Sequence, residues 1–177
     1  IEAVRIINER NLSQRPVEAV IVGDGMCMDC LKAQAKDMPG IHFLGQKPPN
    51  DEVARCLKIS AASVCAGMVG LVANHALAHG CPVITRELDT HSPELEYIEH
   101  DRNGLIVPGD MDSFAGTLAR FADDAAWQAR LAHGALETRD GLRMDDMASR
   151  FDEAVRLTVD RRQTRPQLPV AETEPRA

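Results

Sequence analysis

Four residues with the composition of a phosphate-binding turn, Gly67-Met68-Val69-Gly70, join a strand-like run to a helix-like run in this sequence. An apolar segment at 61–66 precedes the turn, a helical pattern at 71–79 follows it, and a second apolar strand pattern covers 82–85. This order places free backbone N–H groups and the positive end of a helix dipole at the edge of a parallel sheet, where phosphate groups bind. The turn therefore predicts a phosphorylated ligand.

Alternating strand and helix patterns surround this turn and indicate the architecture that positions it. Further strands are expected at 17–22, 41–44 and 105–107. Further helices are expected at 1–11, 26–37, 51–60 with Asn50 as the N-cap, 93–100, 111–123, 124–137 and 144–162. Strands separated by helices of this length form βαβ units, so the fold class is α/β, a Rossmann-like parallel sheet with flanking helices.

The domain organisation that follows is one Rossmann-like unit over 1–163, which the resemblance described below implies to be nucleotide-sugar-binding, and a disordered tail over 164–177. The tail is rich in Pro, Glu and Thr and cannot bury enough apolar area to offset its ordering entropy. The long helix at 144–162 either packs back across the sheet or reaches a neighbouring domain, and the pattern alone does not choose.

Composition excludes several functional classes. The formal net charge of −7 and the aromatic content of 3% argue against a nucleic-acid surface. No apolar run approaches the roughly 20 residues that a membrane-spanning helix needs. We expect a cytoplasmic protein that binds no nucleic acid and has no transmembrane segment.

The five cysteines do not predict a metal or redox site. Cys27 and Cys30 form a CxxC, but no second pair of suitably spaced ligands follows, so we interpret them as ordinary helix residues. Cys65 and Cys81 lie beside apolar strand residues and are expected to be small core side chains. We expect no bound metal and no cofactor.

Four collinear blocks carry a family resemblance: VEAVIVGDG, IHFLGQKPPNDEVARCL, ASVCAGMVGLVANHALAHGCPVIT and HSPELEYIEHDRNGLIVPGDMDSFAGTL. They resemble the C-terminal, donor-binding domain of the family 4 retaining glycosyltransferases of GT-B fold. The resemblance covers about 17–122. It implies a Rossmann-like domain, the C-terminal half of a GT-B fold, that holds a nucleotide-diphosphate sugar and transfers the sugar to an acceptor with retention at the anomeric carbon.

The resemblance also assigns donor-binding residues. It places Gly67, Met68, Val69, Gly70 and Leu71 against the donor diphosphate and sugar. His75 falls where most members carry a glutamate that holds the ribose hydroxyls, and Gly67 falls where they carry an earlier glutamate. The AGMVGL–His75 version resembles a subgroup that reads PGxVGL with a histidine.

Two further positions of the pattern lie outside the turn. Glu94 matches an acidic residue at the start of the next helix, and Gly45 and Lys47 match the loop near the nucleotide base. The alternative for His75 is a helix residue packed beside the sheet. For Glu94 it is an electrostatic role at the helix terminus, and His91 is a candidate to face the same cleft.

Several features of the family pattern are absent from this sequence. An upstream strand, an arginine and a lysine that neutralise the diphosphate are not found, and the chain starts with Ile1 inside a helical pattern. We therefore expect a domain that is incomplete at its N-terminus. The missing strand would be the central one in the order 3-2-1-4-5-6, and a sheet without it would have two unpaired edges.

The expected partners follow from the resemblance. They are the nucleotide-diphosphate sugar, a sugar or lipid-linked acceptor, and a missing N-terminal GT-B domain that carries the acceptor-side catalytic residues. Through that domain the protein would attach peripherally at the inner membrane surface. Two alternatives remain open: a nucleotide-sugar epimerase of GT-B fold, and a non-catalytic, degenerate nucleotide-binding module.

Overall fold

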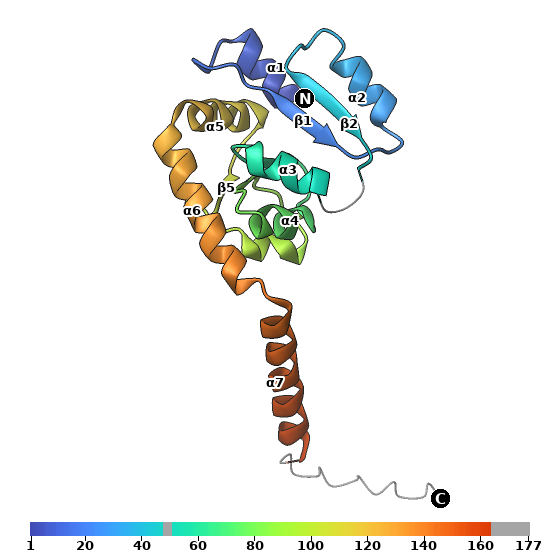
Figure 1. Ribbon diagram of the computed structural model, residues 1–177, viewed down its shortest axis with the longest axis vertical. Coiled ribbons are helices and arrows are strands. Elements are labelled where there is room, and N and C mark those ends of the chain that lie inside the picture. Colours follow the sequence, from blue (N-terminus) through green and yellow to red (C-terminus); the bar gives the residue numbers. More distant parts are fainter. Residues whose placement is uncertain (48–50, 164–177) are drawn as a thin grey trace, which may run out of the picture. The chain divides into compact units, whose positions relative to one another are not determined.

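The computed structural model describes residues 1–47 and 51–163. The chain divides into two compact units, of which the first spans Ile1–Gly141 and the second begins at Leu142 (Figure 1). The predicted N-cap Asn50 and the predicted tail at 164–177 lie outside the described residues.

The first unit opens with a βαβ arrangement. Helix α1 (Glu2–Glu9) precedes strand β1 (Ala19–Val22), and helix α2 (Met28–Gln34) leads to strand β2 (Ile41–Gly45). β1 and β2 pair in parallel, with Ala19 opposite Ile41 (Figure 1). α2 is shorter than the helix predicted at 26–37 because Met26 and Cys27 belong to the turn and cap that precede it.

Three more parallel strands hold the glycine turn. Helix α3 (Asp51–Ile59) leads to β3 (Ser63–Cys65), helix α4 (Val72–Ala78) to β4 (Val83–Arg86), and the 3-10 helix η1 (Pro93–Tyr97) to β5 (Gly104–Val107). Their order is β3-β4-β5. Val83, Ile84 and Thr85 of the central strand are fully buried, as is typical of a parallel strand covered on both faces.

The described strands form two sheets, β1-β2 and β3-β4-β5, where the sequence pattern predicts one. β1 hydrogen-bonds only to β2 and β3 only to β4, so both strands have an open edge within the described part of the chain. The division falls at the position where the doubly wound order places its central strand. The expectation of two unpaired edges is confirmed.

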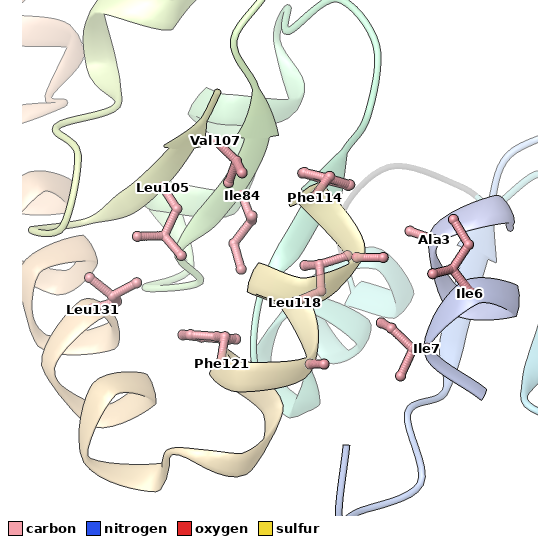
Figure 2. Packing of buried hydrophobic residues seen from close by; sticks show 12 residues of the cluster. Ala3, Ile6, Ile7, Ile84, Leu105, Val107, Phe114, Leu118, Phe121 and Leu131 are labelled. Atoms are coloured by element: carbon pink, nitrogen blue, oxygen red, sulfur yellow. The ribbon is translucent and has the colours of Figure 1, made fainter. Parts of the chain in front are cut away.

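Two further helices complete the first unit and its core. α5 (Met111–Asp123) begins at Asp110, whose carboxylate caps the helix by accepting a hydrogen bond from the Ser113 amide, and α6 (Ala125–Gly141) follows. In the core, α5 residues lie between the side chains of β4 and β5 on one side and those of α1 on the other (Figure 2). The central members of this cluster are Ile6, Ile7, Ile84, Leu105, Phe114 and Leu118.

The second unit contains α7 (Met144–Gln163). Its apolar side chains are exposed, among them Met147 and Phe151. No helix in the described residues combines the length and the apolarity that a bilayer span requires.

Candidate functional site

The glycine turn lies at the carboxyl end of β3 and leads directly into α4. Gly67, Met68 and Leu71 are exposed, whereas Val69 is completely buried and anchors the turn to the body of the domain. A Cβ atom built at Gly67 meets no other atom within 4 Å. The surface next to Gly67 is therefore open, and the turn is not sealed by packed side chains.

The backbone amides of the turn divide into one that is bonded and several that are free. The Val69 amide donates to Nδ1 of His91 at 3.0 Å, so it has no N–H left for a ligand. In the described part of the chain, no hydrogen bond engages the amides of Met68, Gly70 and Leu71. The prediction of free N–H groups thus holds for these positions but not for Val69, because His91 already uses that donor.

Ser92 and Glu94 lie directly beside the turn. The Ser92 amide donates to the Val69 carbonyl oxygen, and the Ser92 hydroxyl lies within hydrogen-bond distance of both that oxygen and the Glu94 carboxylate. A hydroxyl has one proton, so it donates to one of these acceptors at a time. The bond from Ser92 lowers the pKa of Glu94 and favours its charged form. Glu94 also lies in the first turn of η1, as predicted.

His75 lies on the exposed face of α4, and no described residue makes a hydrogen bond to its imidazole. The buried face of this helix is formed instead by Ala73, Ala76 and Leu77. The alternative in which His75 packs beside the sheet is therefore wrong. Its ring is accessible from solvent, one turn beyond the start of α4.

Gly45 is the last residue of β2, and Lys47 lies in the loop that follows the strand. Gly45 adopts a left-handed backbone with φ of 66°, and its carbonyl oxygen accepts a hydrogen bond from the Gly23 amide at 2.9 Å. The Lys47 ammonium pairs with the Glu52 carboxylate of α3 at 2.9 Å. No hydrogen bond within the described residues joins either position to the glycine turn.

The cysteine predictions have mixed outcomes. Cys27 caps the start of α2 and Cys30 lies within it, and both thiols are free and exposed. Cys81 is buried, and burial raises the pKa of its thiol to about 11. Cys65 is only half-buried, so its assignment to the core is wrong. The described residues hold no cluster of three or more candidate metal ligands.

The glycine turn lies on an open face of the domain. Two shallow hollows of the described surface lie elsewhere: one between α1 and the loop after α2, the other between α1 and the loop after it. Neither includes a predicted donor-binding residue.

The sequence did not predict the contacts that Ser92 and His91 make with Val69. The pattern Ser-Pro-Glu marks a helix start, but nothing in it indicates that the serine and the preceding histidine reach back across 22 and 23 residues to Val69. Only the fold brings these loops together.

Comparison with known proteins agrees with this fold. Residues 1–124 match the family model described as Glycosyl transferases group 1. No curated protein sequence matches the chain. Among solved structures, the GtfA/B complex has a TM-score of 0.72 at 13% identity, covering 90% of this chain and 33% of that one.

Two other structures extend the comparison. Anabaena Alr3699/HepE in complex with UDP has a TM-score of 0.66 at 19% identity, with 89% of this chain and 44% of that chain covered. WaaG, a glycosyltransferase involved in lipopolysaccharide biosynthesis, has a TM-score of 0.65 at 16% identity, with 78% of this chain and 37% of that chain covered. The chain spans between a third and a half of the length of these structures.

The likeness to these structures shows a shared fold, and the family model covers well over half of the chain. The α/β architecture, the parallel strands and the glycine turn before α4 agree with that match. The chain belongs to the group 1 glycosyl transferases.

Proposed function

We propose that this chain is the donor-binding part of a retaining glycosyltransferase that takes its sugar from a nucleotide-diphosphate sugar. The observation that carries the proposal is the exposed glycine turn before α4, with free amides at Met68, Gly70 and Leu71, in a member of the group 1 glycosyl transferases. The HepE structures, which contain UDP, UDP with glucose, and UDP-glucose, support the choice of ligand class.

The diphosphate would lie against the turn. When the bond between the sugar and the diphosphate breaks, negative charge develops on the leaving oxygen. Fixed amide dipoles at Met68, Gly70 and Leu71 would stabilise that charge without reorganising. Absence of a Cβ at Gly67 lets the ligand approach the backbone closely. Val69 contributes as the buried anchor rather than as a donor.

Side chains near the turn would hold the remaining parts of the donor. The imidazole of His75 carries ring nitrogens that can form a hydrogen bond with a ribose hydroxyl. The Glu94 carboxylate, which is held in its charged form, accepts hydrogen bonds from sugar hydroxyls. Gly45 and Lys47 would border the base, and Lys47 would first exchange its partner Glu52 for the ligand.

A second domain would complete the crevice and supply the acceptor-side catalytic groups. The open surface around the turn leaves room for it, and the acceptor is a sugar or a lipid-linked sugar. We propose a cytoplasmic site of action, in carbohydrate or cell-envelope polysaccharide synthesis, with peripheral attachment at the inner membrane surface through the second domain. The proposal includes no metal and no cofactor.

Isothermal titration calorimetry of the full chain with uridine, guanosine and adenosine diphosphates tests the binding step. We expect saturable heat with at least one of them. Absence of heat with all three would contradict donor binding and favour a non-catalytic module. Incubation with the matching nucleotide-sugar and no acceptor then tests the reaction class, because isomerisation under these conditions would indicate an epimerase instead.

A further inference from the structure

His91 bridges the glycine turn and the end of β4. Its Nδ1 lies 3.0 Å from the Val69 amide nitrogen, and its Nε2 lies 2.6 Å from the Arg86 carbonyl oxygen. The ring is half-buried, and Val69 is completely buried. We propose that His91 is a positioning residue that holds the glycine turn in its ligand-binding conformation. This inference rests on the proposed function for its consequence, but not for its geometry.

The two hydrogen bonds of His91 are compatible with one tautomer of its ring. The Val69 amide is a donor, so Nδ1 must be an unprotonated acceptor. The Arg86 carbonyl is an acceptor, so Nε2 must carry the proton. Only the neutral Nε2–H tautomer satisfies both partners. In the imidazolium form a second N–H would oppose the Val69 N–H, and the other neutral tautomer would mismatch both bonds.

The loop that contains His91 holds Val69 through both of its backbone groups. His91 accepts from its N–H, and Ser92 donates to its C=O through the Ser92 amide. Together with the buried Val69 side chain, these bonds restrict the backbone rotation of Val69, the third residue of the turn. The Val69 N–H shares a peptide plane with the Met68 carbonyl, and the Val69 carbonyl shares one with the Gly70 N–H, so these bonds fix the direction of the free Gly70 amide and orient the peptide that follows Met68.

The other end of the bridge, the Arg86 carbonyl, belongs to a hydrogen-bonded strand. Arg86 ends β4, and the amide of the next residue, Glu87, donates to the Val107 carbonyl oxygen of β5 at 2.8 Å. His91 therefore connects an exposed turn to a sheet whose central strand is buried. A mobile loop would have to be ordered when a diphosphate binds, whereas a turn held in place binds without that entropic cost.

Three substitutions in the full chain separate the two bonds. His91→Phe removes both and keeps a ring of similar size. His91→Asn keeps an acceptor near the position of Nδ1, and His91→Gln keeps a donor near the position of Nε2. His100→Phe is the matched control, because His100 Nδ1 also accepts a backbone amide, that of Ile106 at 3.1 Å, away from the turn.

We expect His91→Phe to weaken binding of the probe uridine diphosphate about fivefold to tenfold, as loss of ordering hydrogen bonds implies. His91→Asn should restore affinity to within about twofold of the unsubstituted chain because the Val69 bond is the one that acts on the turn. His91→Gln should behave like His91→Phe, and His100→Phe should leave affinity unchanged.

Nuclear magnetic resonance tests the bridge without any ligand. We expect long-range ¹H–¹⁵N correlations to show the Nε2–H tautomer of His91 at neutral pH, and amide exchange at Val69 to accelerate in His91→Phe but not in His100→Phe. A charged His91, the opposite tautomer or unprotected Val69 exchange would overturn the positioning role. If the bridge is observed but no nucleoside diphosphate binds the unsubstituted chain, the proposed function fails while the bridge stands.

Discussion

The buried side-chain amide of Asn103 donates a hydrogen bond to the Thr138 hydroxyl at 2.9 Å and so ties the loop before β5 to α6. The same amide group donates to the Tyr97 carbonyl oxygen at 2.9 Å, and its oxygen accepts from the Glu99 amide at 2.8 Å. Both polar groups of the fully buried Asn103 side chain are thus hydrogen-bonded.

Replacing Asn103 by Ala is expected to lower the free energy of unfolding by about 2–3 kcal/mol, because three partners lose their bonds inside the domain. Urea unfolding followed by circular dichroism measures the change. Asn8→Ala, on the exposed face of α1, is the control and should leave the transition in place. An equal shift in both variants would contradict the role given to Asn103.

Gly67→Val is expected to abolish uridine diphosphate binding while changing the melting temperature little. The added side chain enters open space in the protein, but it occupies the surface proposed for the diphosphate. Calorimetry and thermal unfolding of the same sample separate the two effects.

Gly134→Ala gives the opposite pattern and serves as the comparison for Gly67. A Cβ at Gly134 would lie 2.0 Å from the Arg102 carbonyl oxygen, so this variant should lose stability first. A Gly67 variant that melts as early as Gly134→Ala would show that Gly67 is structural.

His75→Ala should weaken uridine diphosphate binding about fivefold, the effect of one neutral hydrogen bond. Stability should not change, since the imidazole is exposed and makes no bond within the described residues. His133→Ala, exposed on α6, is the matched histidine control. Unchanged affinity in His75→Ala would remove His75 from the site.

Acid should destabilise the domain in part through Asp101. Its carboxylate accepts from Arg130 at 3.0 Å and from Trp127 at 2.8 Å, and these bonds hold its pKa below the usual value. The folded state therefore takes up the proton less readily than the unfolded chain. The stabilisation is present above about pH 4 and is lost as the pH falls through the lower, folded pKa.

Asp101→Asn tests this dependence without changing the backbone, because asparagine also tolerates the left-handed φ of 62° found there. We expect a lower melting temperature than that of the unsubstituted chain at pH 7, and a difference that narrows as the pH falls below about 4. Melting curves of both chains, recorded from pH 7 to well below about pH 4, give the comparison. A difference that stays constant over the whole range would exclude the carboxylate as its cause.

Local signals were sufficient to predict several elements from the sequence. The helix expected at 111–123 has those bounds in the structure, because Asp110 caps it and its apolar residues recur at helical spacing. β4 was predictable to within one residue at each end from the buried apolar pair Val83 and Ile84, which is typical of a parallel strand covered on both faces. The glycine turn was recognisable because a strand pattern precedes it and a helix pattern follows it.

Long-range contacts determined what the sequence did not predict. The helix expected at 93–100 is a 3-10 helix that ends at Tyr97, and His100 instead bridges to Gly104. The hydrogen bond from Val69 to His91 spans 22 residues, and no periodic pattern encodes such a pairing. The donor-binding residues were proposed from the family resemblance, and their roles stay predictions that measurements of ligand binding test.

The open edges of β1 and β3 have a practical consequence for handling the protein. Val20 and Val64 on these strands are 43% and 50% exposed, and each strand presents backbone donors and acceptors along the side that no described strand covers. Such edges template cross-pairing between molecules. Oligomers that form as the concentration rises would then consist of folded chains paired edge to edge. An added peptide with the sequence of β1 or β3 should compete for these edges and dissociate the oligomers.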